Sequence, residues 1–228
     1  MISIHQLHKT YRRGTESVEA ISGIDLEIKK GEFVVILGPS GGGKSTLLNL
    51  IGGIDRPTSG TVSINGFALE NASEENLTRF RRDHIGFVFQ FYNLLSALNA
   101  VENVSLPLMA RGMTFKQSNL EAAQILTRLG LENRLKHLPS ELSGGEQQRV
   151  AIARSIIAEP ELILADEPTG DLDSRNAEEI TGLMHELNKQ LGLTFVVATH
   201  NLRLAEKADR VFELRDGKIQ PNHADKTG

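Results

Sequence analysis

The sequence predicts an α/β fold with a mainly parallel sheet, an N-terminal antiparallel β subdomain and an inserted helical subdomain. Apolar and polar residues alternate near the start, where Ile2 and Ile4 are followed by Ile24, Leu26 and Ile28. This alternation is typical of half-buried antiparallel strands. Later apolar runs are continuous, as in parallel strands that are buried on both faces. Between these runs lies a long stretch with a helical pattern and no strand signal.

The first continuous run, residues 33–37, is rich in β-branched and aromatic side chains and is followed at once by glycines. We therefore expect a buried parallel strand, a loop and then a helix over 46–51. Turn residues, among them Asn65 and Gly66, bracket the next apolar segment, 61–64. This arrangement predicts a short hairpin after the first helix.

The middle of the chain changes from strand to helix. A strand is predicted at 85–89, and from about 99 to 138 the pattern is helical, with Ile125, Leu126 and Leu129 on one face. No strand signal interrupts this stretch. It is therefore interpreted as a helical subdomain inserted into the α/β core.

Strands return in the last part of the chain. Apolar runs at 162–165 and 194–198 are separated by a long helical segment, 175–190. That spacing is typical of a crossover unit, so the two strands should be parallel. Residues 211–219 contain two short strand patterns around an Asp-Gly pair, which predicts a closing hairpin.

Composition limits the classes of function. The chain has 228 residues, enough for one large domain that we expect to span 1–228. Its net charge of -4 lacks the basic excess of a nucleic-acid-binding protein, so no nucleic-acid partner is expected. The basic cluster of Arg79, Arg81 and Arg82 is interpreted as a solvated face. With no cysteine, the chain has neither disulfides nor thiolate metal sites, which fits a reducing compartment.

A membrane anchor is not expected from this sequence. No apolar run approaches the ~18 residues that a membrane helix needs, and residues 1–5 lack the features of a signal peptide. If the protein serves a membrane, another chain must span it. The expected location is then the cytoplasmic face of that membrane.

A glycine-rich segment carries the first chemical signal. Residues 38–46 fit the pattern G-x-x-x-x-G-K-[ST] where a strand passes into a helix, which predicts a P-loop NTPase core. Backbone N–H groups and the helix N-terminus would cradle a phosphate, Lys44 would reach the β- and γ-phosphates, and Ser45 would bind Mg²⁺. A glycine-rich turn without a ligand is the alternative, but the flanking strand and helix favour ATP binding. The candidate phosphate-binding residues are Gly38, Pro39, Ser40, Gly41, Gly42, Gly43, Lys44, Ser45 and Thr46.

Two adjacent carboxylates end the apolar strand at 162–165. They stand at its C-terminal edge, where α/β proteins bind ligands. Asp166 suits Mg²⁺, and Glu167 suits a water molecule that it can orient and deprotonate as the water attacks the γ-phosphate. A solvated acidic strand end is the alternative, and the nearby phosphate loop makes it the weaker interpretation.

Residues 142–149 read Leu-Ser-Gly-Gly-Glu-Gln-Gln-Arg and resemble the signature of ABC-transporter ATPases. A serine and two glycines at a helix start expose N–H groups and a positive dipole end to a phosphate. An N-capped helix without a ligand is the alternative. The resemblance extends over 1–220, and the nucleotide-binding residues it implies here are Ser143, Gly144, Gly145 and Glu146.

The resemblance implies roles for further residues. Gln90 would sense Mg²⁺ and the attacking water, His200 would contact the γ-phosphate, and Tyr11 would stack on adenine. The segment 170–173 resembles a loop that signals between two ATP sites. Catalysis is assigned to Glu167, His200, Gln90 and Lys44, and Mg²⁺ binding to Ser45, Gln90 and Asp166. The catalytic core is expected at 1–90 and 159–220, with the helical subdomain at about 91–158.

Two segments depart from the usual family pattern. Gly42 replaces a more common Ser or Cys, and Gly170-Asp171 stands where Ser-Ala is widespread. The first change should be tolerated because the backbone of this loop binds phosphate.

A finer resemblance, carried by residues 11–14, 18–20, 91–95 and 100–108, is to the LolD and MacB branch of the family. It implies a homodimer that encloses two ATP molecules head to tail. It also implies a separate permease with few membrane helices and a large extracytoplasmic domain. The branch serves lipoprotein release and the efflux of drugs, peptides or haem. Phe91 and Tyr92 are expected to be exposed beside Gln90, where the permease would dock.

Three alternatives remain: a soluble ABC-type ATPase, another phosphate-loop enzyme such as a GTPase or small-molecule kinase, and a cassette without catalysis. A soluble ABC-type ATPase of translation or DNA repair would need two cassettes or long insertions, for which the chain is too short. A GTPase should contain N-K-x-D, and the nearest string, 188–191, lacks the aspartate. A regulatory cassette without catalysis is opposed by intact Lys44, Glu167 and His200.

Overall fold

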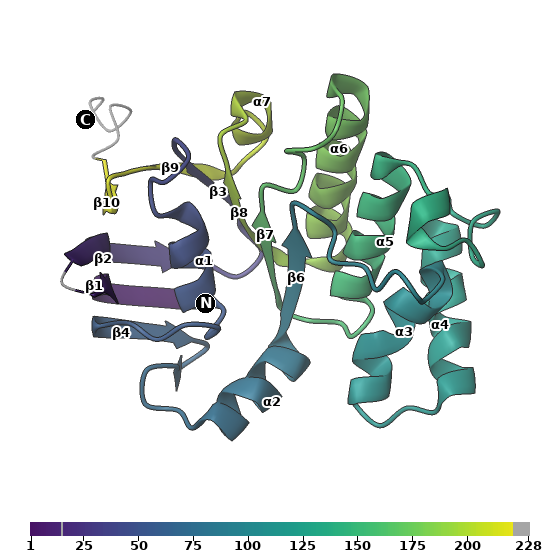
Figure 1. Ribbon diagram of the computed structural model, residues 1–228, viewed down its shortest axis with the longest axis horizontal. Coiled ribbons are helices and arrows are strands. Elements are labelled where there is room, and N and C mark those ends of the chain that lie inside the picture. Colours follow the sequence, from purple (N-terminus) through teal and green to yellow (C-terminus); the bar gives the residue numbers. More distant parts are fainter. Residues whose placement is uncertain (15, 221–228) are drawn as a thin grey trace.

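A computed structural model describes residues 1–14 and 16–220, so residue 15 and the end of the predicted domain, 221–228, lie outside the described residues. Figure 1 shows antiparallel strands on one side, a group of helices on the other, and parallel strands between them. The strands form a four-stranded sheet, β2-β1-β4-β5, and a six-stranded sheet, β10-β9-β3-β8-β7-β6. The predicted α/β fold class is confirmed.

The smaller sheet contains the predicted antiparallel strands. Its members are β1 (Ile2–Arg13), β2 (Glu16–Ile28), β4 (Ser59–Ile64) and β5 (Phe67–Ala68). Ile2 pairs with Ile28 and Ile4 with Leu26, and all four side chains are buried. The alternation of apolar and polar residues therefore arises because one face of this sheet packs into the core. The predicted hairpin after the first helix is β4 and β5.

The larger sheet is parallel except at one edge. Its strands are β3 (Phe33–Leu37), β6 (Ile85–Phe89), β7 (Leu162–Asp166), β8 (Thr194–Thr199), β9 (Arg210–Arg215) and β10 (Lys218–Ile219), and only the β9–β10 pair is antiparallel. Phe33 and Val35 enter one hydrophobic cluster, whereas Val34 and Ile36 enter another. Burial of both faces explains why the apolar runs in the sequence are continuous.

Helices flank the parallel strands. The phosphate-loop helix α1 (Lys44–Ile51) follows β3, α6 (Ser174–Leu191) connects β7 with β8, and α7 (Leu202–Ala205) follows β8. The predicted segments α3 (Ala100–Ala110) and α4 (Phe115–Arg128) pack together, and η1 (Pro139–Glu141) leads into α5 (Gly144–Ile156). Leu126 and Leu129 are buried, as the predicted helix face requires.

Helix α2 (Glu74–His84) escaped the sequence prediction, as did the shorter segments η1 and α7. Residues of the basic cluster lie on α2, which Ser73 caps by accepting from the N–H of Asn76. Charged residues dominate this helix and Leu77 is its only buried side chain, so no apolar period marks it. Arg79 and Arg82 are exposed as predicted, but Arg81 is half-buried and donates to the Gly53 carbonyl at 2.6 Å. The prediction of a purely solvated face is therefore wrong for Arg81.

Candidate functional site

The carboxyl ends of four neighbouring parallel strands bring the predicted motifs to one edge of the sheet. Leu37 pairs with Thr199, Ala198 with Asp166, and Asp166 with Phe89. Each strand is followed at once by a residue that the sequence singled out. Gly38 follows β3, Gln90 follows β6, Glu167 follows β7 and His200 follows β8.

The loop between β3 and α1 is closely packed against the rest of the core. A Cβ atom at Gly38 would collide with the carbonyl oxygen of Leu214. At Gly43 φ is 100°, and a Cβ atom there would lie 2.6 Å from the Ala20 carbonyl oxygen. Only glycine satisfies both constraints. Gly38 and Gly43 therefore fix the shape of the loop.

Lys44 is buried at the start of α1, with 6% of its surface exposed. Its ammonium group donates to the carbonyls of Gly38 and Pro39 at 2.9 and 3.0 Å. Glu167 Oε1 lies 3.4 Å from the same nitrogen. A buried ammonium group needs hydrogen-bond acceptors or a negative charge nearby. These contacts supply both, and they fix the Lys44 nitrogen between the loop and the acidic end of β7.

Asp166 contains a buried oxygen without a partner. Its Oδ1 makes no hydrogen bond among the described residues. Burial raises the pKa of this carboxyl, while a hydrogen bond with Ser45 acts in the opposite direction. An unpaired buried carboxylate oxygen beside a hydroxyl is a donor set that suits a hard cation such as Mg²⁺. The described residues contain no group of three His, Asp or Glu side chains that would bind a metal by themselves.

Glu167 lies at the centre of a polar cluster. Its Oε2 accepts from the Thr199 hydroxyl at 2.9 Å, and its Oε1 lies 3.0 Å from His200 Nδ1. Burial acts to raise the pKa of Glu167, but the hydrogen bonds of His200 and Thr199 and the positive charge of Lys44 outweigh it, so this pKa lies below its usual value. The backbone of Glu167 has φ of 45°, an uncommon conformation for a residue with a side chain.

A cavity of about 510 Å³ lies between these motifs. It is lined by residues from the phosphate loop and by Gln90 and Glu167, so the structure brings these predicted site residues together. The cavity is also lined by Val18, Glu19 and Ala20 of β2 and by Asp216 and Gly217. The sequence marked those two segments only as a branch resemblance and a turn. Thr199 was missed too, because a threonine ending a strand gives no distinct signal.

Gln90 is connected to the segment that resembles a signalling loop. Its amide Nε2 donates to Asp171 Oδ1 at 3.1 Å, and a Cβ atom at Gly170 would lie 3.2 Å from the same nitrogen. Asp173 then caps α6 by accepting from the N–H groups of Arg175 and Asn176. Gln90 and this loop therefore meet within one chain.

Next to Gln90, the chain turns sharply. Phe91 is 72% exposed, but Tyr92 is half-buried, so the prediction that both are exposed is wrong for Tyr92. Arg154 of α5 donates to the Tyr92 and Asn93 carbonyls at 2.7 and 2.6 Å, and the Tyr92 hydroxyl lies close to Gly144. These contacts hold Tyr92 against both ends of α5, and its side chain is partly buried.

The start of α5 does not contribute to the cavity. Ser143 caps the helix by accepting from the Glu146 N–H, and Glu146 accepts from the Ser143 N–H at 2.8 Å. Arg134 donates to the other Glu146 oxygen at 2.7 Å. None of Ser143, Gly144, Gly145 and Glu146 lines the cavity at the phosphate loop. Within one chain, the two predicted phosphate-binding segments are thus separate.

Tyr11 lies on β1 and is not among the residues that line the cavity. Its side chain is 42% exposed, and its hydroxyl donates to Asp55 Oδ2 at 2.7 Å. The predicted aromatic residue is therefore accessible, and its orientation is set by a residue that the sequence did not single out.

A family model described as "ABC transporter" matches residues 21–170. The lipoprotein-releasing system ATP-binding protein LolD of Legionella pneumophila (strain Lens) is 44% identical over 219 residues, which is 96% of each chain. ABC transporter H family member 2 of Dictyostelium discoideum is 46% identical, and the match covers 96% of this chain and 43% of that protein.

Solved structures of ATP-binding cassettes also resemble this chain. A dimeric post-hydrolysis state of the ATP-binding cassette MJ0796, bound to ADP and Pi, has a TM-score of 0.90 and 44% identity, with 97% of each chain covered. A second dimeric structure of MJ0796, described as a bacterial ABC transporter cassette, has a TM-score of 0.90 and 45% identity over the same share of each chain.

Proposed function

This chain belongs to the ABC transporter family. On that basis we propose which residues bind and hydrolyse ATP, and which partner and cargo the chain has. It is an ATP-binding and ATP-hydrolysing subunit of a transporter. The proposed catalytic core is 1–90 and 159–220, and the proposed helical subdomain is about 91–158. A purely regulatory role, or a soluble role without transport, is not favoured, because the LolD relative, an ATP-binding protein of a releasing system, matches over 96% of both chains.

The phosphate loop, Lys44 and the start of α1 bind the phosphates of ATP in this proposal. The closely packed glycines fix the loop, and the ammonium group lies at its centre. Ser45 and Asp166 would hold Mg²⁺, with Gln90 nearby. When bound, the ion would neutralise charge on the phosphate oxygens. The unpaired Asp166 oxygen supports this assignment.

Glu167 is proposed to be the general base. Its pKa is low, so the carboxylate is ionised at neutral pH and can accept the proton of a water molecule. The water oxygen then bonds to the γ-phosphorus, the bond to the β-phosphate oxygen breaks, and ADP leaves as phosphate is released. His200 lies 3.0 Å from Glu167 and would orient it and contact the γ-phosphate. Gln90 would place the water.

A second copy of the chain is proposed to complete each site. Ser143, Gly144 and Gly145 stand at a helix start suited to a phosphate but do not line their own cavity. Head-to-tail pairing around a two-fold axis would bring them to the phosphate loop of the other copy and create two equal sites. The dimeric structures of MJ0796 support this proposal.

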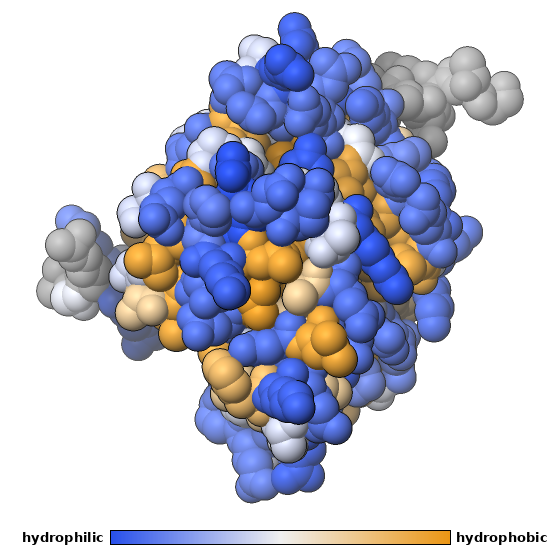
Figure 2. Space-filling model, turned by 90° about the vertical axis from the view of Figure 1, so that its right-hand side faces the viewer, coloured by the Kyte–Doolittle hydropathy of each residue, from blue (hydrophilic) through white to orange (hydrophobic). Residues whose placement is uncertain are grey.

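A permease is the proposed membrane partner, which would place this chain at the cytoplasmic face of the membrane. Among the described residues, no helix is long and apolar enough to span a bilayer. Figure 2 shows the side that carries the helices α3 to α5, where apolar groups lie among hydrophilic ones. Exposed apolar residues on or next to these helices include Phe91, Leu95, Met109, Met113, Phe115 and Leu120. We propose that the surface around Gln90–Leu95 contacts a cytoplasmic helix of the permease.

Crosslinking tests this contact cleanly because the chain has no cysteine. Cysteines at the exposed positions Asn93 and Ser96 should crosslink to the permease, whereas a cysteine at Lys30 serves as the remote control. Labelling from Lys30 alone would contradict the proposed docking surface.

The proposed cargo is a lipoprotein, because LolD relatives match over 96% of both chains. The test is complementation of a strain depleted of its own LolD, with this chain supplied together with its own permease. Restored lipoprotein release by the wild type and not by Glu167→Gln is expected. Failure of the wild type, combined with drug, peptide or haem export by the same pair, would assign the chain to efflux.

A further inference from the structure

Three side chains form a compact unit beside the phosphate loop. Asp55 accepts from the Tyr11 hydroxyl with Oδ2 at 2.7 Å and from the Lys9 ammonium with Oδ1 at 2.6 Å. The Lys9 nitrogen also lies 4.8 Å from the centre of the Tyr11 ring. One carboxylate therefore holds both the tip of the aromatic side chain and a cation that faces its ring.

Lys9 is buried more deeply than most lysines. Only 12% of its side chain is exposed, and it also donates to the Arg56 carbonyl at 2.7 Å. A cation held this firmly covers one face of the tyrosine ring, while 42% of Tyr11 remains exposed. One face of the ring is therefore occupied by the cation, and the residue as a whole remains partly accessible to solvent.

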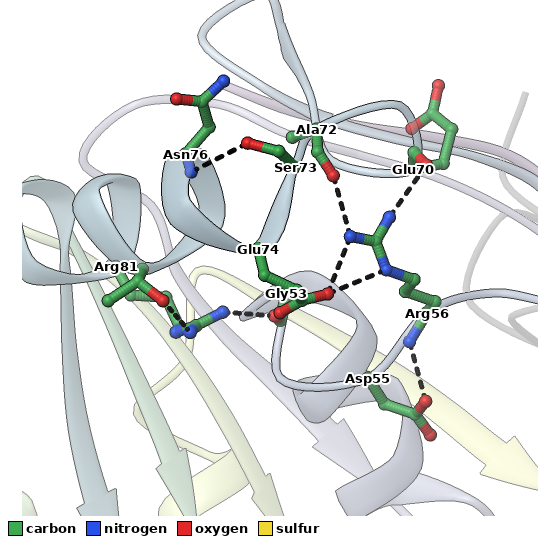
Figure 3. Close-up of polar contacts among 10 residues, drawn as sticks. Gly53, Asp55, Arg56, Glu70, Ala72, Ser73, Glu74, Asn76 and Arg81 are labelled. Carbon is green, nitrogen blue, oxygen red and sulfur yellow. Dashed lines mark hydrogen bonds and ion pairs between the residues drawn. The ribbon is translucent and has the colours of Figure 1, made fainter.

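The backbone around Asp55 is itself anchored, as Figure 3 shows. Arg56 donates from its backbone N–H to Asp55 Oδ1 at 2.7 Å and from its guanidinium to Glu74 at 2.7 Å and to the Ala72 carbonyl at 2.8 Å. On the other side, Arg81 donates to the Gly53 carbonyl at 2.6 Å. Asp55 thus stands on a fixed turn that follows the phosphate-loop helix α1.

The protonation states keep these roles fixed. Burial acts to raise the pKa of Asp55, but hydrogen bonds from Lys9 and Tyr11 outweigh it, so that pKa lies below its usual value. Burial and the Asp55 carboxylate raise the pKa of Tyr11. At neutral pH the carboxylate can only accept, and the phenol is the donor.

We propose that Asp55 and Lys9 are positioning residues for adenine binding, which hold Tyr11 with one ring face covered and the other open to the base. This inference rests on the proposed ATP binding and on the stacking of adenine on Tyr11 that the family resemblance implies. A free tyrosine ring would have to be ordered when the base binds, and a ring that is already ordered avoids that entropic cost. The turn after α1 would then fix the base platform, as the start of α1 fixes the phosphate loop.

Calorimetric titration of ADP and of inorganic tripolyphosphate, both with Mg²⁺, separates base from phosphate recognition. Tyr11→Ala should weaken ADP binding by roughly tenfold, as expected for loss of one stacked base. Asp55→Asn, Lys9→Met and Tyr11→Phe should each weaken ADP binding by about threefold, because the ring remains but is less ordered. None should change tripolyphosphate binding. Lys30→Met is the matched control, since Lys30 pairs with Glu161 and not with this unit.

The double variants decide the mechanism. If Asp55 and Lys9 act through the ring, neither substitution weakens ADP binding further in a Tyr11→Ala chain. Wild-type ADP affinity in Asp55→Asn and Lys9→Met, with a loss in Tyr11→Ala, would overturn the inference and leave the tyrosine platform standing. An equal loss of tripolyphosphate binding would also overturn it, because the substitutions would then have disturbed the phosphate loop. Unchanged ADP affinity in Tyr11→Ala would instead overturn the platform itself.

Discussion

The two regions predicted to bind phosphate differ in how complete they are within one chain. At the phosphate loop, the Lys44 ammonium group at the start of α1 lies 3.4 Å from the Glu167 carboxylate at the end of β7, and both residues line one cavity. At the start of α5, Ser143 and Glu146 are engaged in a capping box. The first region is an assembled site, whereas the second is a rigid surface that can contribute to a site elsewhere.

ATP hydrolysis is therefore expected to depend on two separate parts of the chain: the cluster at the phosphate loop performs the reaction, and the start of α5 completes the site of another copy. Groups that touch the reacting phosphate are expected to cluster at the assembled site, so changes there should stop turnover. Changes at the start of α5 should leave that cluster intact and should affect ATP turnover only when two copies meet. Substitutions in the two regions should therefore have different consequences.

The largest effect is expected for Glu167→Gln. Loss of the base should lower ATP turnover by about 10²- to 10⁴-fold. ATP should still bind and should drive stable dimers, because the substitution removes one negative charge near the γ-phosphate. Steady-state ATPase rates and light scattering with Mg-ATP measure both effects. Glu186→Gln, an exposed change on α6, is the control. Turnover near the wild-type rate would remove Glu167 from its proposed role.

A backbone collision gives the next largest effect. In Gly38→Ala, the new methyl group would strike the Leu214 carbonyl, so the free energy of unfolding should fall by about 1–3 kcal/mol and ATP binding should weaken. Gly182→Ala is the matched control because a Cβ atom there meets open space within helix α6. That control should be neutral or stabilising. Urea unfolding of the two variants makes the comparison, and equal stabilities would contradict the tight packing of the loop.

Removal of the α5 cap should have a smaller effect on stability. Ser143→Ala removes the side chain that accepts from the Glu146 N–H, and caps of this kind contribute about 1 kcal/mol. ADP binding to the monomer should not change, because Ser143 does not line the cavity at the phosphate loop. Unfolding curves and calorimetry with ADP test the two halves of this prediction. A large loss of monomer ADP affinity would mean that the two regions are not separate.

The smallest effect is expected for Glu146→Gln, whose effect on stability should depend on pH. Burial acts to raise the pKa of Glu146, but hydrogen bonds from Ser143 and Arg134 outweigh it, so the folded pKa lies below its usual value. Its stabilising contribution is therefore present above the unfolded pKa and is lost as pH falls through the folded pKa. Glu146→Gln should be less stable than the wild type by under about 1 kcal/mol at pH ~7, and the gap should close toward pH ~3. A gap that widens in acid would reverse the assigned sign.

Much of the fold could be predicted from sequence because its signals are local. Continuous apolar runs mark β3, β7 and β8, and alternation marks β1 and β2. Helix α2 was missed because it buries only Leu77, and its capping serine is a weak signal by itself. Such a helix is stabilised by its tertiary contacts, among them Arg56 with Glu74 and Arg81 with Gly53.

The site was predictable where motifs are contiguous and unpredictable where side chains from distant segments meet. Lys44 and Glu167 lie in recognisable motifs, and the structure adds that they are 3.4 Å apart. Asp55 belongs to no motif, and its contacts with Lys9 and Tyr11 bridge more than forty positions along the chain. Only the register of β1 and the turn after α1 bring these groups together.

We propose that each active site combines the phosphate loop of one copy with Ser143 to Gly145 of the other. Heterodimers isolated with two different tags test it most directly. One mixture pairs a Lys44→Ala chain with a Gly145→Asp chain, and the other pairs a doubly substituted chain with the wild type. In shared sites, the first mixture has one site with both lesions and one with none, whereas the second has a lesion in each site.

ATPase activity should therefore persist in part in the first mixture and be lost in the second. Ser143→Ala in place of Gly145→Asp gives a milder version of the same pairing. If the two sites must act together, both mixtures lose activity, and ATP-driven dimerisation in a Glu167→Gln background then tests the claim: Gly145→Asp should block it. Activity that is retained by the second mixture and lost by the first would show that each site lies within one chain, and would contradict the account.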